Sequence, residues 1–187
     1  MPNVLVPLAQ GCEELEAVTV IDILRRANIT VVTAGLDDKP VSASRGVVLM
    51  PDMTLDEAMK QSFDMIVLPG GLPGADHLNN DSRIHQLLKD MQAQGKFTAA
   101  ICAAPKVLAE AGLLANKSVT HYPGAVEQTK FPTTQFFTEK SVIKDGTVLT
   151  SRGPGTAMDF ALALVETLVG KEIRDTVEVA LVRSAAV

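Results

Sequence analysis

Short runs of apolar residues, each about the length of a strand, alternate along the chain with segments of helical periodicity. The runs cover 4–8, 29–34, 65–68 and 97–101. Strands that are apolar throughout fit a parallel sheet that is covered on both faces. The segments 13–28 and 81–94 carry apolar residues at the spacing of a helix. This alternation predicts an α/β domain with a mostly parallel sheet and helices on both faces.

Local signals predict the remaining elements. Thr54 and Glu57 stand at the spacing of a capping box, which predicts a short helix over 54–59. A second helix is expected from Ala103 onward, because Pro105 is tolerated in a first turn. Further strands or hairpins are expected over 39–50, 118–121, 142–143 and 148–150, and further helices over 154–169 and 172–182.

The length and composition limit the class of protein. The 187 residues suit one domain, 1–187, without a linker or repeat. The formal charge of −5 and the 4% of aromatic residues, with no Trp, argue against tight nucleic-acid binding. Two cysteines do not make a secreted disulfide framework, and no basic segment precedes the first apolar run. We therefore expect a cytoplasmic protein that binds neither nucleic acid nor membrane.

Cys102 is the candidate nucleophile. It stands where a buried strand meets a helix, among small alanines that suit a tight elbow between strand and helix. The N-terminus of the following helix is expected to lower the pKa of the Cys102 thiol, leaving Cys12 as an ordinary thiol. The alternative is that Cys102 is an inert core residue, as free cysteines often are.

The other candidate residues carry weaker signals. The Gly70-Gly71 turn after a buried strand is either an anion-binding backbone nest or a plain turn. The acids Glu13, Glu14 and Glu16 complement a helix dipole, and their spacing alone does not show which one points inward. His121 is the only candidate partner for a thiolate, because His77 and His85 are expected on exposed faces. The histidines lack metal-ligand spacing, so no metal is expected.

Four motifs in uninterrupted order resemble the DJ-1/ThiJ/PfpI superfamily, and most closely the branch that contains the human parkinsonism-associated protein and bacterial ThiJ-type relatives. They are GCEELEA at 11–17, VLPGG at 67–71, AAICAAP at 99–105 and TSRGPGT at 150–156. The resemblance covers nearly the whole chain. It implies a flavodoxin-like three-layer sandwich and a homodimer. Cys12, and Tyr122-Pro123 after His121, depart from the human-type pattern.

The resemblance also implies roles for individual residues. Cys102 matches the reactive cysteine, Glu16 a protonated glutamate against the sulfur, and His121 a nearby histidine. Backbone amides beside the site fall on Gly70, Gly71 and Ala103. Two arginines near the dimer interface fall on Arg26 and Arg45, one from each subunit.

A first-helix stripe of Leu15, Val18 and either Ile21 or Asp22 is expected to face inward. Glu16 is expected at its edge, deep enough for burial to keep the carboxyl protonated near pH 7. Glu13 and Glu14 are expected in the solvated first turn, so Glu16 is the expected catalytic acid.

Two functions follow from the resemblance. The first is a cysteine-dependent, glutathione-independent glyoxalase or deglycase that acts on methylglyoxal-type dicarbonyls or their adducts and needs no cofactor. The second is a redox-responsive chaperone, a holdase without turnover, in which Cys102 senses oxidation. Both functions use the same cysteine, so the sequence separates them poorly.

Overall fold

The computed structural model describes residues 1–183 of the chain, and the predicted domain over 1–187 extends past them by 184–187. A seven-stranded sheet has the order β10-β11-β7-β6-β1-β2-β5. All neighbours in it are parallel except β10, which runs antiparallel to β11. Its strands are β1 Asn3–Leu8, β2 Thr30–Gly35, β5 Met53–Thr54, β6 Met65–Leu68, β7 Phe97–Ile101, β10 Val142–Asp145 and β11 Val148–Ser151.

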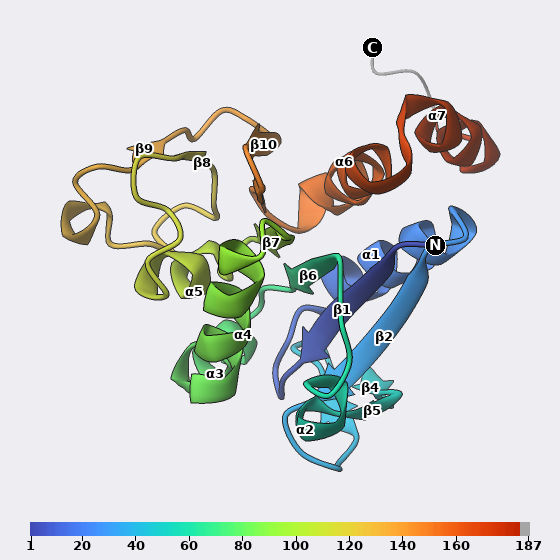
Figure 1. The fold of residues 1–187 in the computed structure, drawn as a ribbon, viewed down its shortest axis with the longest axis horizontal. Helices are drawn as coiled ribbons and strands as arrows, with labels where there is room; N and C mark the ends of the chain where they lie inside the picture. Colours follow the sequence, from blue (N-terminus) through green and yellow to red (C-terminus); the bar gives the residue numbers. More distant parts are fainter. Residues whose placement is uncertain (184–187) are drawn as a thin grey trace.

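Helices cover both faces of this sheet (Figure 1). Residues of α1, α6 and α7 pack into a core on one face, and residues of α2, α3, α4 and α5 pack into a core on the other. The helices are α1 Glu14–Arg26, α2 Leu55–Ala58, α3 Gly74–Asn80, α4 Ser82–Ala93, α5 Pro105–Glu110, α6 Ala157–Val169 and α7 Lys171–Ala180. The predicted flavodoxin-like, three-layer arrangement is confirmed.

Two short strand pairs lie beside the main sheet. β3 Val41–Ser42 and β4 Val48–Leu49 form the antiparallel pair expected over 39–50. β8 Ser118–Val119 and β9 Gln135–Phe136 form a parallel pair, and β8 ends two residues before His121. Short 3-10 turns cover Gln128–Lys130 and Pro154–Thr156.

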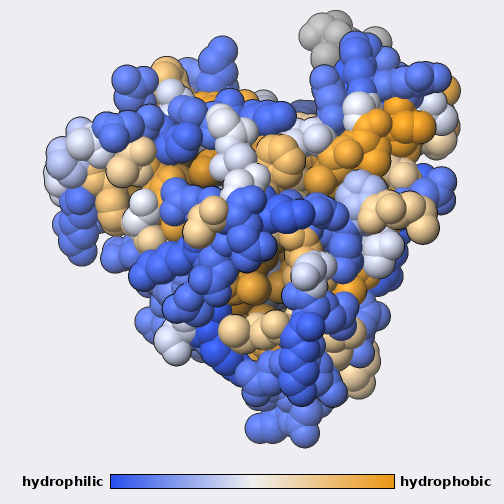
Figure 2. Space-filling view, in the orientation of Figure 1, coloured by the Kyte–Doolittle hydropathy of each residue, from blue (hydrophilic) through white to orange (hydrophobic). Residues whose placement is uncertain are grey.

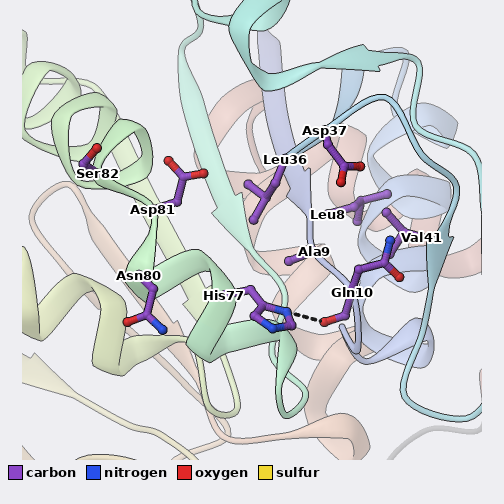
Figure 3. Close-up of a pocket in the computed structure, with 10 residues that line it drawn as sticks. All are labelled: Leu8, Ala9, Gln10, Leu36, Asp37, Val41, His77, Asn80, Asp81 and Ser82. Atoms are coloured by element: carbon purple, nitrogen blue, oxygen red, sulfur yellow. Dashed lines mark hydrogen bonds between the residues drawn. The ribbon is translucent and has the colours of Figure 1, made fainter.

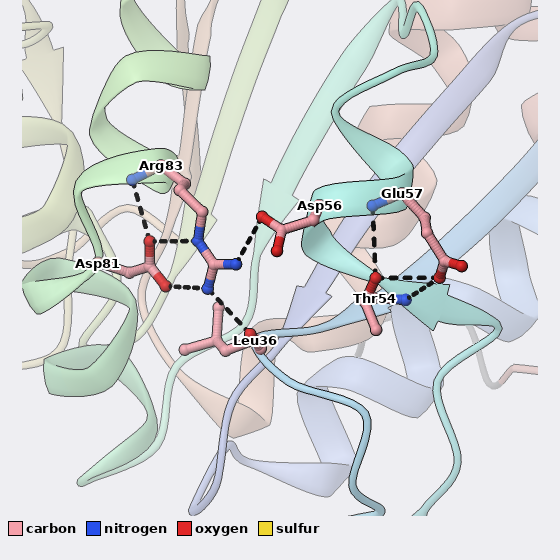
Figure 4. A network of polar contacts seen from close by, with 6 residues as sticks. All are labelled: Leu36, Thr54, Asp56, Glu57, Asp81 and Arg83. Carbon is pink, nitrogen blue, oxygen red and sulfur yellow. Dashed lines mark hydrogen bonds and ion pairs between the residues drawn. The ribbon is translucent and has the colours of Figure 1, made fainter.

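Polar contacts fix the loops at the end of the sheet that carries β2 and β5 (Figure 4). The predicted capping box is present, with Thr54 and Glu57 bonded reciprocally at the start of α2. Arg83 in α4 donates to the carboxylates of Asp81 and Asp56 and to the carbonyl of Leu36. This arginine therefore holds α4, α2 and the segment after β2 together, at the carboxyl end of β2.

The inward face of α1 differs from the predicted one. Leu15 and Val18 are exposed and Ile21 is half-buried, whereas Glu16, Ala17, Val20, Ile23 and Leu24 are buried. The apolar residues at three-residue steps thus lie on the outer side of the helix. The prediction was wrong because apolar spacing was taken to mark the core, although a helix can carry a second apolar face.

The start of α5 also differs from expectation. The helix begins at Pro105, so Ala103 and Ala104 belong to a turn between Cys102 and the helix. Among the α-helices and strands, three were not predicted: α3, the strand β5 at the edge of the sheet, and the strand β9 that pairs with β8. On the surface, Figure 2 shows a mostly hydrophilic face on which hydrophobic residues gather over α6.

Candidate active site

Cys102 sits on a strained turn at the carboxyl end of β7. Its φ is 64°, a left-handed conformation that residues other than glycine rarely adopt. Its N–H donates to the carbonyl of Ser151 at 3.0 Å, and its carbonyl accepts the N–H of Tyr122 at 2.9 Å. Two neighbouring segments therefore hold the elbow in place and leave the side chain aimed away from the strand.

Glu16 approaches this cysteine from α1. It is fully buried, and its Oε2 accepts the N–H of Gly70 at 2.8 Å. Its Oε1 has no hydrogen-bond partner among residues 1–183. Burial raises the pKa of Glu16 to about 7, although the Gly70 N–H and the Cys102 side chain oppose this shift. The predicted burial and raised pKa of Glu16 are thus confirmed.

The predicted acidity of Cys102 is wrong. Burial, followed by the charge of Glu16 and hydrogen bonding to it, raises the pKa of the Cys102 thiol to about 12. The expected helix field is weak here, because α5 is only six residues long and starts three residues further on. The pKa of Cys12 is also raised, to about 11, mainly by burial. Cys102 and Glu16 consequently resist being ionised together and share one proton around neutral pH.

Backbone N–H groups line the sulfur side of this pair. Those of Gly71 and Ala103 bond to the Cys102 side chain and lower its pKa. The N–H of Gly70, by contrast, is already taken by Glu16. A Cβ on Gly70 would lie 2.7 Å from the Cys102 Cβ and 2.8 Å from Glu16 Oε2. Any side chain at this position would therefore clash with both Cys102 and Glu16, so only glycine fits between them.

Glu14 is buried rather than solvated, contrary to expectation. Its carboxylate accepts the backbone N–H of Arg45 at 2.8 Å and the hydroxyl of Ser44 at 3.0 Å. Burial acts to raise the pKa of Glu14, but hydrogen bonds from Ser44 and from backbone N–H groups lower it overall. Glu13 also accepts from the Ser44 hydroxyl, at 2.8 Å. The two acids thus anchor the turn between β3 and β4, which carries Arg45, onto the start of α1.

His121 is buried near the elbow but bonds elsewhere. Its Nδ1 lies 2.6 Å from the carbonyl of Tyr122 and its Nε2 lies 3.3 Å from Nε2 of Gln128. Its ring meets Phe136 edge-on, with centroids 5.4 Å apart. The imidazole is thus held by neighbours other than Cys102, and the link to Cys102 runs through the backbone of Tyr122.

The remaining predicted residues lie apart from the Cys102–Glu16 pair. Arg26 is exposed and pairs with Asp22 at 2.6 Å, and the side chain of Arg45 donates to the Ser44 carbonyl at 3.2 Å. His77 is exposed as expected, whereas His85 is half-buried with Nε2 on the carbonyl of Asn79 at 2.8 Å.

A cavity of about 460 Å³ is separate from Cys102, Glu16 and His121. It lies at the ends of β1 and β2 beside α3, where Figure 3 shows His77 bonded to the carbonyl of Gln10. Within the described part of the chain, His, Cys, Asp and Glu side chains do not gather in threes as a metal site needs. No helix of residues 1–183 is long and apolar enough to cross a membrane.

A cysteine on a strained elbow, a buried glutamate and a Gly-Gly turn thus stand together at the carboxyl end of the sheet. The family model described as "DJ-1/PfpI family" matches residues 2–167. The chain belongs to the DJ-1/PfpI family. Among curated relatives of the family, the Parkinson disease protein 7 homolog of Danio rerio is 43% identical over 180 residues, which are 95% of each chain.

Two further comparisons within the family bear on fold and function. The crystal structure of Drosophila melanogaster DJ-1beta superposes with a TM-score of 0.92 at 41% identity, covering 98% of this chain and 99% of that one. A Caenorhabditis elegans relative named glutathione-independent glyoxalase DJR-1.2 is 37% identical over 163 residues, 87% of this chain and 86% of its own. The family thus includes a protein named as an enzyme.

Proposed function

We propose that the chain is a cytoplasmic, cysteine-dependent, glutathione-independent glyoxalase or deglycase that acts on methylglyoxal-type dicarbonyls or their adducts. The observation that carries the proposal is the buried pair of Cys102 and Glu16, in which a carboxyl with a pKa of about 7 lies against a thiol. Such a carboxyl gains and loses a proton readily at neutral pH, which suits general acid–base catalysis. The name of the nematode relative supports the same reaction class.

The first step forms a bond between sulfur and carbon. The Cys102 thiol passes its proton to the carboxylate of Glu16, to which it is hydrogen-bonded, as the sulfur attacks the aldehyde carbon. The carbonyl oxygen takes the negative charge, and the N–H groups of Gly71 and Ala103, which now bond to the sulfur, are placed to hold it. Glu16 then returns the proton to this oxygen, which gives a hemithioacetal.

The second step moves hydrogen within the substrate. Glu16, again a carboxylate, removes the proton from the former aldehyde carbon and delivers it to the neighbouring carbonyl carbon. The hydroxyl proton moves to the second oxygen, and the product is a thioester of lactate on Cys102. Water then cleaves the carbon–sulfur bond, which releases lactate and restores the thiol. His121 is assigned a positioning role through Tyr122, whose N–H bonds the Cys102 carbonyl.

A redox-responsive holdase is the second candidate function. It is favoured by the N–H groups of Gly71 and Ala103 at the sulfur, because these donors suit the oxygens of a sulfinate. In this proposal oxidation of Cys102 changes the protein surface, and no substrate is consumed.

One experiment separates the two functions. Methylglyoxal loss and lactate formation are followed in buffer without glutathione, with aggregation of a denatured client protein measured in parallel. The enzyme proposal expects one lactate for each methylglyoxal consumed, at a rate that saturates with substrate. Suppression of aggregation only after mild peroxide, without lactate formation, would favour the holdase.

The proposal includes a homodimer. Apolar residues stand exposed on α1 and around β4, namely Leu15, Val18, Val48 and Met50. Glu14 joins these two regions through Arg45, so they border one area of the surface. A second copy covering this area brings Arg26 of one subunit near Arg45 of the other. Light scattering at micromolar concentration is expected to give about twice the 19.9 kDa of one chain, and a monomer mass would contradict the dimer.

Glu16→Gln is expected to lower kcat/KM for methylglyoxal at pH 7 by about 10²-fold, in line with the loss of one acid–base group. In the wild type, activity rises as the pH rises through about 7, where the Cys102–Glu16 pair loses its first proton. In the variant the buried thiol must ionise without an acceptor, so the rise moves to higher pH. The pH profile of kcat/KM measures this shift.

Glu13→Gln is the matched control, because Glu13 belongs to the same helix start and bonds to Ser44 instead of Cys102. Its profile is expected to keep the wild-type shape and to move slightly to lower pH, because the charge of Glu13 contributes to the raised pKa of Glu16. An unchanged profile in Glu16→Gln would show that Glu16 has only a structural role.

A further inference from the structure

A second pocket adjoins the elbow that carries Cys102. It has a volume of about 300 Å³ and is lined by Tyr122, Pro123 and the turn 152–156. Both lining segments are hydrogen-bonded to the backbone of Cys102. The N–H of Tyr122 donates to the Cys102 carbonyl, and the carbonyl of Ser151, just before the turn, accepts from the Cys102 N–H. The pocket therefore borders the segments that hold the elbow, although Cys102 itself does not line it, and it is separate from the cavity at the ends of β1 and β2.

Arg152 brings an uncompensated positive charge to this pocket. The guanidinium groups of Arg25, Arg26, Arg83, Arg174 and Arg183 all pair with carboxylates. That of Arg45 forms no ion pair within residues 1–183 but donates to the carbonyl of Ser44. Arg152 is half-buried, lines the pocket, and forms no ion pair within residues 1–183. A guanidinium presents paired N–H donors that match the two oxygens of a carboxylate. In a chain of net charge −5, such a free cation marks a place for an anion.

Tyr122 gives the pocket a flat apolar wall. Its ring packs against Gly153. A Cβ at this glycine would lie 3.3 Å from Tyr122 Cδ2, so a larger residue would push the ring away. The side chain is half exposed, which leaves ring surface available to a ligand. Tyr122 is also the only tyrosine of a chain without tryptophan. Its fluorescence therefore reports on this pocket alone.

We propose that this pocket binds the carboxylate of small organic acids, with Arg152 pairing with the acid and Tyr122 packing against its carbon chain. The proposal deepens the proposed function and rests on it for one consequence: the pocket holds the acid end of a dicarbonyl adduct while the Cys102 sulfur bonds to the former aldehyde carbon, and the thiol or amine of the adduct leaves that carbon with the Cys102 proton. Adducts of amino acids that retain a free carboxylate are then better substrates than their neutral amides. Binding of a carboxylate itself does not depend on turnover.

The first test measures binding through the fluorescence of Tyr122 in the wild-type protein. N-acetylglycine is titrated against its uncharged counterpart, N-acetylglycinamide. We expect a saturable change with the acid and none with the amide. Arg152→Gln is expected to weaken binding of the acid about tenfold, the effect of one charge-assisted hydrogen bond, and Arg152→Lys by less. Equal responses to acid and amide, or no response to either, would overturn the subsite.

The second test measures substrate preference. Hemithioacetals of methylglyoxal with N-acetylcysteine and with N-acetylcysteine amide both release free methylglyoxal. The rate measured with methylglyoxal alone, at its equilibrium concentration, is therefore subtracted from each before the two kcat/KM values are compared. We expect the acid to be preferred about tenfold, and Arg152→Gln to bring the ratio close to one.

Arg183→Gln is the control, because Arg183 pairs with Asp159 in α6 and lies outside the pocket. A ratio of one in the wild type would overturn the preference. Turnover of neither adduct would instead overturn the proposed function, and the fluorescence titration would then decide the subsite by itself.

Discussion

Replacing Cys102 by serine is expected to lower kcat/KM for methylglyoxal by about a thousandfold or more, because the reaction loses its nucleophile. A serine hydroxyl is far less acidic than a thiol, so Glu16, with a pKa of about 7, is too weak a base to activate it. The strained backbone at φ 64° is available to serine as it is to cysteine. The fold is therefore expected to remain, and the loss to lie in kcat rather than in stability.

Cys12→Ser is the matched control for this variant. Cys12 is equally buried and its pKa is also raised, but it is absent from the groups that interact with Cys102. Lactate formation is measured for both variants, with circular dichroism as the check on folding. A folded Cys102→Ser protein that forms lactate at the wild-type rate would refute the mechanism. Equal losses in both variants would point to a damaged core instead of a lost nucleophile.

The sequence was sufficient for the fold because its strands are apolar throughout. Runs such as 4–8 and 65–68 have no polar side to place toward water, which favours helices on both faces. The capping box of Thr54 and Glu57 could also be predicted from the sequence, because both residues lie within one helical turn. The short strand β5 escaped prediction, since two residues carry too little pattern and its pairing with β2 is a tertiary contact.

The elbow at Cys102 could also be predicted from the sequence, but the pKa of its thiol could not. The prediction of an acidic thiol considered only the next helix, which follows Cys102 in sequence. The dominant effects come from burial and from Glu16, which is 86 residues away in the chain and reaches the sulfur only in the folded protein. In the same way, no local pattern shows that Glu14 binds the Arg45 turn.

The two faces of α1 explain why its orientation was misjudged. One side carries Ala17, Val20 and Leu24 into the core together with Glu16, and the other exposes Leu15 and Val18. Sequence periodicity alone does not separate a core face from a face that a second subunit covers, because both are apolar. Glu16 is the signal of function on the core face, because its Oε1 is buried without a hydrogen-bond partner among residues 1–183. The carboxylate of Glu14 avoids this cost by bonding to Ser44 and Arg45.

Gly71→Ala is expected to lower the free energy of unfolding by about 2–5 kcal/mol, which is the second large effect. The φ of Gly71 is +88°, which costs a residue with a Cβ about 1–2 kcal/mol. The added Cβ would also lie 2.6 Å from the carbonyl oxygen of Gly11 and 2.7 Å from the carbonyl carbon of Cys12. These are backbone atoms, so the loop before α1 must shift, at a further cost of about 1–3 kcal/mol.

Gly112→Ala separates the two causes of this loss. Gly112 has a similar φ of +83°, but a Cβ there would meet nothing within 4 Å. The Gly112→Ala variant is therefore expected to lose only the cost of the positive φ, about 1–2 kcal/mol of the free energy of unfolding. Urea denaturation of both variants measures the difference. Because the shifted loop leads into the helix of Glu16, Gly71→Ala is also expected to slow lactate formation while Gly112→Ala does not. Equal stability losses would show that the Gly71 turn yields to a side chain, so that the close packing of Gly11, Cys12 and Gly71 does not hold the site in place.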